Sequence, residues 1–236
     1  LWTQQELFHA ALTTSHPRTL AEVKERVAGA RPIRALPAPP FMHGTAHWVA
    51  FNMWHVGGTV VVQSNVNRLD ADDIWSTVER EKVNALAIVG DAFARPLIDQ
   101  LRAKTYDLSS LFLVSSGGAI FSENLKRDLI DLLPKLRILD TLGSSESGAQ
   151  ATHTSSRQTG VRTGEFDMNA GNTVLSEDLS RRLEPGSPET GWLAREGYVP
   201  LGYYRDPEKT ARTFAVVDGL RYSVPGERAR VAPDGQ

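Results

Sequence analysis

The sequence has 236 residues, of which 41% are hydrophobic, so the chain can bury a real core in one large domain or in one domain with a smaller companion. Lysine and arginine total 26 against 28 acidic residues. A net charge of -2 without a long basic block disfavours nucleic acid and anionic membranes as partners and favours small molecules. The absence of cysteine excludes disulfides and thiolate metal sites. Because no signal peptide and no run of roughly 20 apolar residues is found, we expect a cytoplasmic location.

The first segments of the chain are expected to form two helices and a connector. The Thr-x-x-Glu spacing at 19–22 is that of a capping box and predicts a helix that ends at Gly29. Residues 36–40 contain three prolines, which predicts a rigid connector and neither a helix nor a central strand. Residues 41–55 carry four aromatic side chains and predict a mostly buried helix that ends before the glycine pair at 57–58.

Strand-like and helix-like patterns alternate from residue 59 to residue 139. Short apolar or β-branched runs predict four strands, at 59–63, 85–89, 111–114 and 136–139. Apolar residues at helical spacing predict helices at 70–82, 91–104 and 122–133. Short apolar strands separated by amphipathic helices imply right-handed crossovers and a parallel sheet covered on both faces. The predicted fold class is therefore α/β, with a parallel sheet flanked by helices.

The pattern changes after about residue 150, since ten of the 19 glycines lie in the last 86 residues. Short strands are predicted at 161–165, 173–175, 191–195 and 221–224, a turn at 184–187, and a helix at 206–214 with Asp206 as its cap and Pro207 in its first position. We expect an α/β subdomain over residues 1–150 that contains a nucleotide and acyl crevice. A smaller β-rich, distorted barrel-like subdomain is expected over residues 151–236.

Glycine and hydroxyl residues follow three of the predicted strands, at 90–91, 115–119 and 141–148. In parallel sheets, ligands bind beyond the carboxyl ends of the strands, where the backbone can approach them, so these ends predict a shared ligand crevice. Ser144, Ser145 and Glu146 offer two hydroxyls and one carboxylate, which suit phosphate oxygens and a hydrated Mg²⁺ ion. Taken alone, the run is read more readily as a solvated turn than as a ligand site, because serine and glycine are ordinary turn residues.

Four motifs stand in a characteristic order: PPFMHG at 39–44, SSGGA at 115–119, LGSSESG at 142–148, and PLGYYRDPEKT with GLRYSVPGE between 200 and 227. Together they resemble the adenylate-forming acyl-CoA synthetase family, and more narrowly the bacterial, especially actinobacterial, fatty-acyl or steroid-acid CoA ligases. The resemblance runs from about residue 36 to the last residue. It implies a role in fatty-acid or other lipid metabolism, in which ATP activates a hydrophobic carboxylic acid to an acyl-adenylate and then to acyl-CoA. ATP or AMP, Mg²⁺ and CoA are the implied cofactors and small-molecule partners.

The resemblance also assigns roles to the residues at the predicted strand ends. Glu146 matches the acid that holds Mg²⁺, and Ser145 matches a hydroxyl residue near the α-phosphate, so both are catalytic candidates. Gly117, Gly118 and Ala119 match the loop that lines the adenine and acyl pockets.

Leu142, Gly143 and Ser144 belong to the same implied nucleotide site. Leu142 stands where most relatives carry an aromatic residue that stacks on adenine, so its contact would be aliphatic. Glu227 stands where the family usually has an aspartate that takes both ribose hydroxyls, and its side chain is one methylene longer.

The implied acyl pocket lies at the PPFMHG motif. His43 matches the histidine at this pocket, with Trp48 and Phe51 behind it. The two aromatic residues would serve equally as plain core. His43 and His47 are four residues apart, which could place two imidazoles on one helical face, but the segment has no cysteine and no acid that would favour a metal site.

Two parts of the family pattern have no match. The serine-, threonine- and glycine-rich phosphate loop that ends in Pro-Lys-Gly is absent, and the small C-terminal domain with its catalytic lysine would begin just past Gln236. We therefore expect an internal fragment of the large N-terminal domain, from a parent that is cytoplasmic or peripheral to a membrane. The fragment should bind AMP or an acyl-adenylate weakly and catalyse little, because the electrostatic stabilisation is incomplete.

Two other functions remain open at this point. A non-catalytic nucleotide-binding α/β module would bind nucleotide without dependence on Mg²⁺. A dinucleotide oxidoreductase is disfavoured, since no Gly-x-Gly-x-x-Gly follows a predicted strand.

Overall fold

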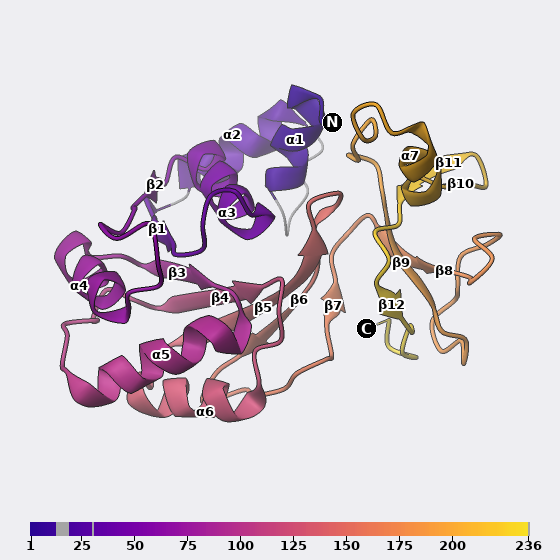
Figure 1. Cartoon of the computed structure of the whole chain (residues 1–236). Coiled ribbons are helices and arrows are strands. Elements are labelled where there is room, and N and C mark those ends of the chain that lie inside the picture. Colours follow the sequence, from indigo (N-terminus) through magenta and orange to yellow (C-terminus); the bar gives the residue numbers. More distant parts are fainter. Residues whose placement is uncertain (13–18, 30, 236) are drawn as a thin grey trace. The chain divides into compact units, whose positions relative to one another are not determined.

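A computed structural model of the chain describes residues 1–12, 19–29 and 31–235 (Figure 1). The chain folds into two compact units. The parallel-sheet unit consists of Thr19–Thr141 and His153–Glu165, and the antiparallel unit consists of Leu1–Arg18, Leu142–Thr152 and Phe166–Gln236. Residue 150 lies inside the segment 142–152 of the antiparallel unit.

The parallel-sheet unit contains parallel strands in the order β2-β1-β3-β4-β5. These strands are β1 (Arg34–Pro37), β2 (Thr59–Val60), β3 (Ala85–Ile88), β4 (Leu113–Gly117) and β5 (Arg137–Ser144). The helices are α2 (Leu20–Gly29), α3 (Gly44–His55), α4 (Ala71–Glu81), α5 (Gly90–Ala103) and α6 (Glu123–Leu132). In Figure 1, α3 lies on one side of the sheet and α5 and α6 lie on the other. This architecture confirms the α/β prediction.

Three helices of this unit begin at residues that the sequence marks as starts. The hydroxyl oxygen of Thr19 accepts a hydrogen bond from the amide of Glu22 at 3.2 Å. The carboxylate of Asp70 accepts one from the amide of Asp73 at 3.2 Å. Ser122 is the residue before α6, but its side chain makes no capping hydrogen bond. Each acceptor satisfies a backbone N–H of the first turn, which has no partner inside its own helix.

The prediction of a connector at 36–40 is wrong for its first two residues, because Leu36 and Pro37 belong to β1, a central strand. Proline is tolerated there because of its position in the ladder. The amide of Ala38 bonds to Ala87 of β3 and the carbonyl of Ala35 accepts from Val61, so odd-numbered residues of β1 face β2. The pairing with β2 ends at Ala35, so the missing N–H of Pro37 breaks no ladder hydrogen bond.

Two further expectations in this unit differ from the structure. Helix α3 begins at Gly44, and its buried residues are Ala46 and Ala50, whereas Trp54 is 57% exposed. The helix is therefore only partly buried, and its fully buried residues are small, not aromatic. Residues 161–165 form no strand; Val161 packs against the core, residues 162–165 are exposed, and the carbonyl of Arg162 accepts a hydrogen bond from Lys126.

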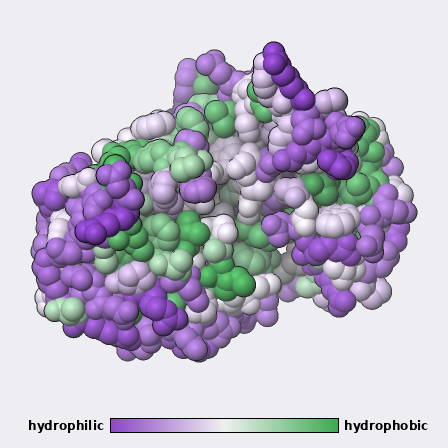
Figure 2. All heavy atoms as spheres, in the orientation of Figure 1, coloured by the Kyte–Doolittle hydropathy of each residue, from purple (hydrophilic) through white to green (hydrophobic). Residues whose placement is uncertain are grey.

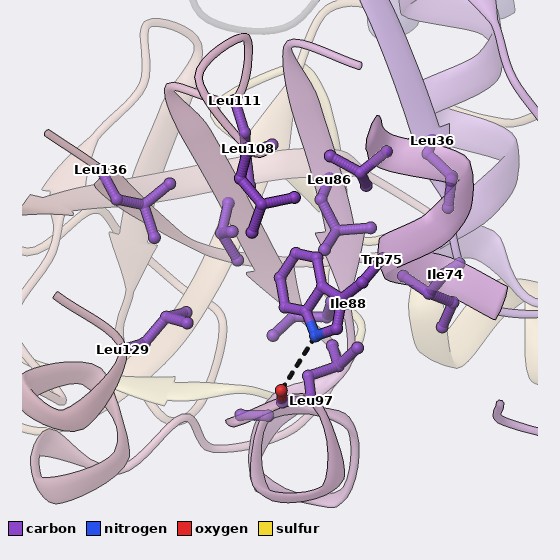
Figure 3. Packing of buried hydrophobic residues seen from close by; sticks show 14 of the residues in the cluster. Leu36, Ile74, Trp75, Leu86, Ile88, Leu97, Leu108, Leu111, Leu129 and Leu136 are labelled. Carbon is purple, nitrogen blue, oxygen red and sulfur yellow. Dashed lines mark hydrogen bonds between the residues drawn. The ribbon is translucent and has the colours of Figure 1, made fainter. Parts of the chain in front are cut away.

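The core of the parallel-sheet unit is a single apolar cluster between the sheet and its helices (Figure 3). Trp75 is fully buried at its centre, and its indole N–H donates to the carbonyl of Leu97 at 2.9 Å. This bond satisfies the one polar atom of a side chain that contributes a large apolar area. The aliphatic residues around it come from β1, β3, α4, α5, α6 and the intervening loops, and include Leu36, Ile74, Leu86, Ile88, Leu108, Leu111, Leu129 and Leu136.

The antiparallel unit is organised around β9 (Gly191–Glu196), which pairs in antiparallel fashion with β8 (Asn172–Leu175), β11 (Leu220–Ser223) and β12 (Arg228–Ala229). The other elements are α1 (Gln4–Ala11), β7 (Asp167–Met168), α7 (Pro207–Thr213), β10 (Val216–Val217) and the first part of β6 (Gly148–Ser155), whose residues 153–155 belong to the parallel-sheet unit. The strands expected at 173–175, 191–195 and 221–224 are confirmed within one residue at either end. The expected helix is confirmed as α7, with the carboxylate of Asp206 accepting from the amide of Lys209 at 2.9 Å.

The surface is mostly hydrophilic on the face that Figure 2 shows, with hydrophobic residues in smaller areas between. Several large hydrophobic side chains are exposed, among them Met42, Val66 and Ile120. They come from different loops of the parallel-sheet unit, as is usual for surface residues that are scattered singly. Among the residues that the structure describes, no helix has the length and apolar character needed to traverse a bilayer.

Candidate functional site

The LGSSESG run forms the end of β5, a tight turn and the start of β6. Strand β5 continues to Ser144, residues 145–147 turn, and β6 begins at Gly148, whose φ is +67°. A Cβ atom at Gly143 would collide with the carbonyl oxygen of Gly148. The two glycines therefore allow the strands to meet closely and present residues 145 and 146 at the tip of the turn.

The serine hydroxyls of this turn have different roles. The hydroxyl of Ser147 is buried, lies 2.9 Å from that of Ser144 and donates to Gln150 at 2.9 Å. The hydroxyl of Ser144 also accepts from the amide of Glu146 at 3.1 Å. Both hydroxyls therefore hold the turn together, whereas Ser145 is exposed and can meet a ligand. Of the two hydroxyls that the sequence suggested for phosphate, Ser145 is the better placed.

Three side chains from distant parts of the antiparallel unit hold the turn, and we name Trp2, Arg195 and Tyr203 the turn bracket. The indole N–H of Trp2 donates to the carbonyl of Ser145 at 3.2 Å. The guanidinium of Arg195 donates to the carbonyl of Ser147 and, at 3.3 Å, to that of Ala149. The hydroxyl of Tyr203 donates to the carboxylate of Glu146 at 2.6 Å.

Sequence reasoning missed all three residues of the turn bracket. Tyr203 stands in the quoted GYY motif, which was the one available signal, but its partner is 57 residues away. Arg195 is buried, and burial lowers its pKa to about 10, so the guanidinium stays protonated at neutral pH. Burial first, and then the bond to Glu146, raise the pKa of Tyr203, so its hydroxyl keeps the proton that it donates.

A single carboxylate, that of Glu146, lies on the turn, and one of its oxygens is held by Tyr203. Among the residues described, no three or more His, Asp or Glu side chains gather in a way that could hold a metal. Mg²⁺ in nucleotide enzymes commonly takes one or two carboxylates and completes its shell with water and phosphate oxygens. The donor set thus fits an Mg²⁺ ion that arrives with the phosphates of a nucleotide, and it does not provide an all-protein cage.

The SSGGA motif ends β4 in the parallel-sheet unit. Gly117 pairs with Thr141 of β5, the residue before Leu142 in the chain. Gly118 has a φ of +84°, a conformation that glycine adopts without strain. A Cβ atom there would lie 3.5 Å from the hydroxyl of Thr45, so the first turn of α3 lies beside this glycine. Ala119 follows in the same exposed loop.

The candidate acyl-pocket residues lie on or next to α3. His43 is the N-terminal cap residue and is exposed, while Trp48 and Phe51 are half-buried. The ring of Phe51 lies 5.6 Å from that of Trp54 and 6.2 Å from that of His55. These contacts form an aromatic row along α3 that is neither fully core nor fully exposed.

A separate pocket of about 270 Å³ opens in the parallel-sheet unit beside the end of β1. It is lined by residues 37–41, Val62, Gln63, residues 66–69 and Phe93. Phe41 is thus part of its wall, and His43, Trp48 and Phe51 are not among its lining residues. Its wall is mostly apolar, with Arg68 as the charged lining residue.

Glu227 lies just before β12 in the antiparallel unit, the unit that also contains the turn. Its carbonyl accepts a hydrogen bond from the amide of Leu193 in β9 at 2.8 Å, while its side chain is exposed. Gly226 before it has a φ of +117°. The backbone of Glu227 is therefore fixed to the central strand, and its carboxylate is available to a ligand. Leu142, by contrast, is half-buried and packs against the cluster formed with Val174 and Leu193.

Residues 3–204 match the family model described as AMP-binding enzyme. This match covers most of the chain, including the β5–β6 turn, so the chain belongs to the AMP-binding enzyme family. A medium-chain acyl-CoA ligase named Mig, from Mycobacterium avium, is 43% identical over 241 residues, which cover 100% of this chain and 44% of that protein. A 3-oxocholest-4-en-26-oate--CoA ligase from Rhodococcus rhodochrous is 39% identical over 205 residues, which cover 84% of this chain and 36% of that protein.

Solved structures agree with this assignment at the level of the fold. A long-chain-fatty-acid-CoA ligase from Archaeoglobus fulgidus has a TM-score of 0.74 and 18% identity, and the match covers 100% of this chain and 47% of that one. A nonribosomal peptide synthetase solved with AMPPNP bound has a TM-score of 0.79 and 20% identity, and the match covers 99% of this chain and 25% of that one. The chain spans less than half the length of the curated relatives described above.

Proposed function

We propose that this chain is the nucleotide-binding core of an enzyme that activates a hydrophobic carboxylic acid with ATP and transfers the acyl group to the thiol of CoA. The relatives named as acyl-CoA ligases support this reaction class. The observation that carries the proposal for this chain is the tip of the β5–β6 turn, where an exposed Ser145 stands beside a carboxylate that is already fixed by a hydrogen bond.

In this proposal the residues of the turn handle the phosphates. Glu146 would hold Mg²⁺, which would supply positive charge to offset that of the phosphates. The hydroxyl of Ser145 donates to the α-phosphate. Ser144 supports the turn from within, since its hydroxyl accepts from the amide of Glu146, and Gly143 allows the close approach of the strands.

The remaining roles follow the family pattern. Gly117, Gly118 and Ala119 line the adenine and acyl pockets, and Leu142 gives adenine an aliphatic contact. Glu227 accepts hydrogen bonds from the ribose hydroxyls. His43, Trp48 and Phe51 contact the acyl group, which we propose to be a fatty acid or a steroid side-chain acid because relatives are named for both.

We expect replacement of Glu227 by alanine to weaken the binding of a non-hydrolysable acyl-adenylate analogue about tenfold. The reason is the loss of two hydrogen bonds to a charged acceptor, reduced by the exposure of the side chain. Isothermal titration calorimetry measures the change directly. Glu184→Ala, at an exposed glutamate of a turn in the same unit, is the matched control and should bind like the wild type. Equal affinity of both variants would contradict the ribose role.

We expect replacement of Glu146 by glutamine to abolish the dependence of nucleotide affinity on Mg²⁺, because the neutral amide is a poor ligand for a hard cation. The measurement compares the affinity for α,β-methylene-ATP in excess Mg²⁺ and in EDTA. A non-catalytic nucleotide-binding module predicts that the wild type itself binds the nucleotide equally well in both media. It also predicts that the substitution has no effect. Binding itself is expected to be weak, since no segment of this sequence matches the Pro-Lys-Gly phosphate loop.

A further inference from the structure

Tyr203 is fixed at three points within the antiparallel unit. Its amide donates to the hydroxyl of Thr210 at 2.9 Å, and its ring lies 5.9 Å from that of Phe214. The ammonium of Lys209 stands over the same ring at 4.2 Å from its centre. The backbone and the ring are both restrained by α7 and the residue that follows it, so the hydroxyl is placed without help from Glu146.

Glu146 is restrained in a different way. Its amide is held by Ser144 inside the turn, but its side chain extends from the tip, where the hydroxyl of Tyr203 is its one hydrogen-bond partner among the described residues, at 2.6 Å. A glutamate on a turn otherwise samples many rotamers, and ordering it costs free energy when a ligand binds. The rigid tyrosine thus orders a side chain that would be mobile on its own.

We propose that Tyr203 is the positioning residue for the cation ligand of this site: its hydroxyl holds one oxygen of Glu146 so that the carboxylate is preset for the divalent cation that accompanies the nucleotide. The inference rests on the proposed function, which assigns the cation to Glu146. Hydrogen bonds from a hydroxyl to an ionised carboxylate are short and strong. Partners that orient a metal ligand in this way commonly change metal affinity when they are removed.

A positioning role and a purely structural role have different thermodynamic signatures. If the bond only stabilised the fold, its removal would lower stability and would leave the coupling between cation and nucleotide unchanged. If it presets Glu146, its removal weakens nucleotide binding in the presence of the cation and leaves binding in EDTA unchanged. The ratio of the two affinities isolates the positioning effect.

The test variant is Tyr203→Phe, which keeps the ring contacts with Phe214 and Lys209 and removes only the hydroxyl. Its matched control is Tyr204→Phe, at a neighbouring tyrosine that is exposed. The chain is titrated calorimetrically with α,β-methylene-ATP in excess Mg²⁺ and in EDTA. We expect Tyr203→Phe to reduce the Mg²⁺ enhancement of affinity about tenfold, with unchanged affinity in EDTA. Tyr204→Phe should retain the wild-type enhancement.

A second variant keeps the test decisive if Tyr203→Phe also lowers stability. Glu146→Asp withdraws the carboxylate from Tyr203 while leaving residue 203 intact, and we expect it to reduce the enhancement as well. In the Glu146→Asp background, Tyr203→Phe should then have no further effect, because the bond is already lost.

The outcomes distinguish a failure of this inference from a failure of the proposed function. If the wild type shows no Mg²⁺ enhancement, or if Glu146→Gln keeps it, both the function and the positioning role are wrong. If Glu146→Gln loses the enhancement but Tyr203→Phe keeps it, the function stands and the positioning role is overturned. A loss of affinity for Tyr203→Phe that is equal in Mg²⁺ and in EDTA also overturns it, since the tyrosine would then act on the fold of the site.

Discussion

Replacement of Lys126 by methionine is expected to lower the free energy of unfolding by about 3–5 kcal/mol. The Lys126 side chain is fully buried, and its ammonium lies 2.6 Å from the carboxylate of Asp140, which is itself 8% exposed. The ammonium also donates to the carbonyl of Arg162 at 2.7 Å and to the hydroxyl of Thr163 at 2.9 Å. Methionine fills the space but leaves a buried carboxylate without its cationic partner and a carbonyl without its donor, which costs more than the lost attraction alone.

The same substitution should increase the dependence of stability on pH. Burial raises the pKa of Asp140, and the hydrogen bond and charge of Lys126 oppose that rise. In Lys126→Met the folded-state pKa rises further above the unfolded value, so the folded protein binds the proton more tightly than the unfolded chain. Stability of the variant therefore falls as pH rises from the unfolded pKa through the folded pKa, and the loss is smaller at about pH 5 than at about pH 8.

Urea unfolding followed by circular dichroism at both pH values tests these expectations. Lys135→Met, at an exposed lysine between α6 and β5, is the matched control and should change stability by less than about 0.5 kcal/mol. The double variant Lys126→Met with Asp140→Asn should lose the extra dependence on pH. Destabilisation below about 1 kcal/mol for Lys126→Met would mean that Asp140 finds another partner or water.

Replacement of Gly143 by alanine is the second change with a large expected effect. An added Cβ would overlap the carbonyl oxygen of Gly148 and approach the backbone of Ala149 to 3.1 Å, and neither group is a flexible side-chain end. The strands would have to separate where they enter the turn. We expect the free energy of unfolding to fall by about 3 kcal/mol, near the upper end for single substitutions, because backbone must move.

The consequence for the site is loss of nucleotide binding, since the turn that presents Ser145 and Glu146 would shift. Urea unfolding and calorimetric titration with the acyl-adenylate analogue measure the two effects. Gly29→Ala is the control, because a Cβ there has no atom within 4 Å. Wild-type stability and binding in Gly143→Ala would show that the strands can move apart at little cost.

Local patterns in the sequence were sufficient for much of the parallel-sheet unit. Thr19 and Asp70 each begin a helix where a cap was expected or where the helical pattern starts, because capping depends on residues within one turn. Asp206 does the same for α7 in the antiparallel unit. The alternation of short strands and helices indicated a parallel sheet, since it reports which faces must be buried. The central place of β1 was missed, because its prolines argue against a strand and only its neighbours show that Pro37 breaks no ladder bond.

In the candidate site, too, some features follow from the local sequence and others only from the fold. The sequence was sufficient to indicate a turn between Gly143 and Gly148 that carries Glu146, because turn chemistry is local. Only the tertiary structure decided which hydroxyls are used inside the turn and which side chains hold it from outside. Tyr203 and Trp2 meet this turn from 57 and 143 residues away, and such partners are selected by packing of the whole unit. No periodicity or spacing in the sequence indicates these contacts, so only the folded structure reveals them.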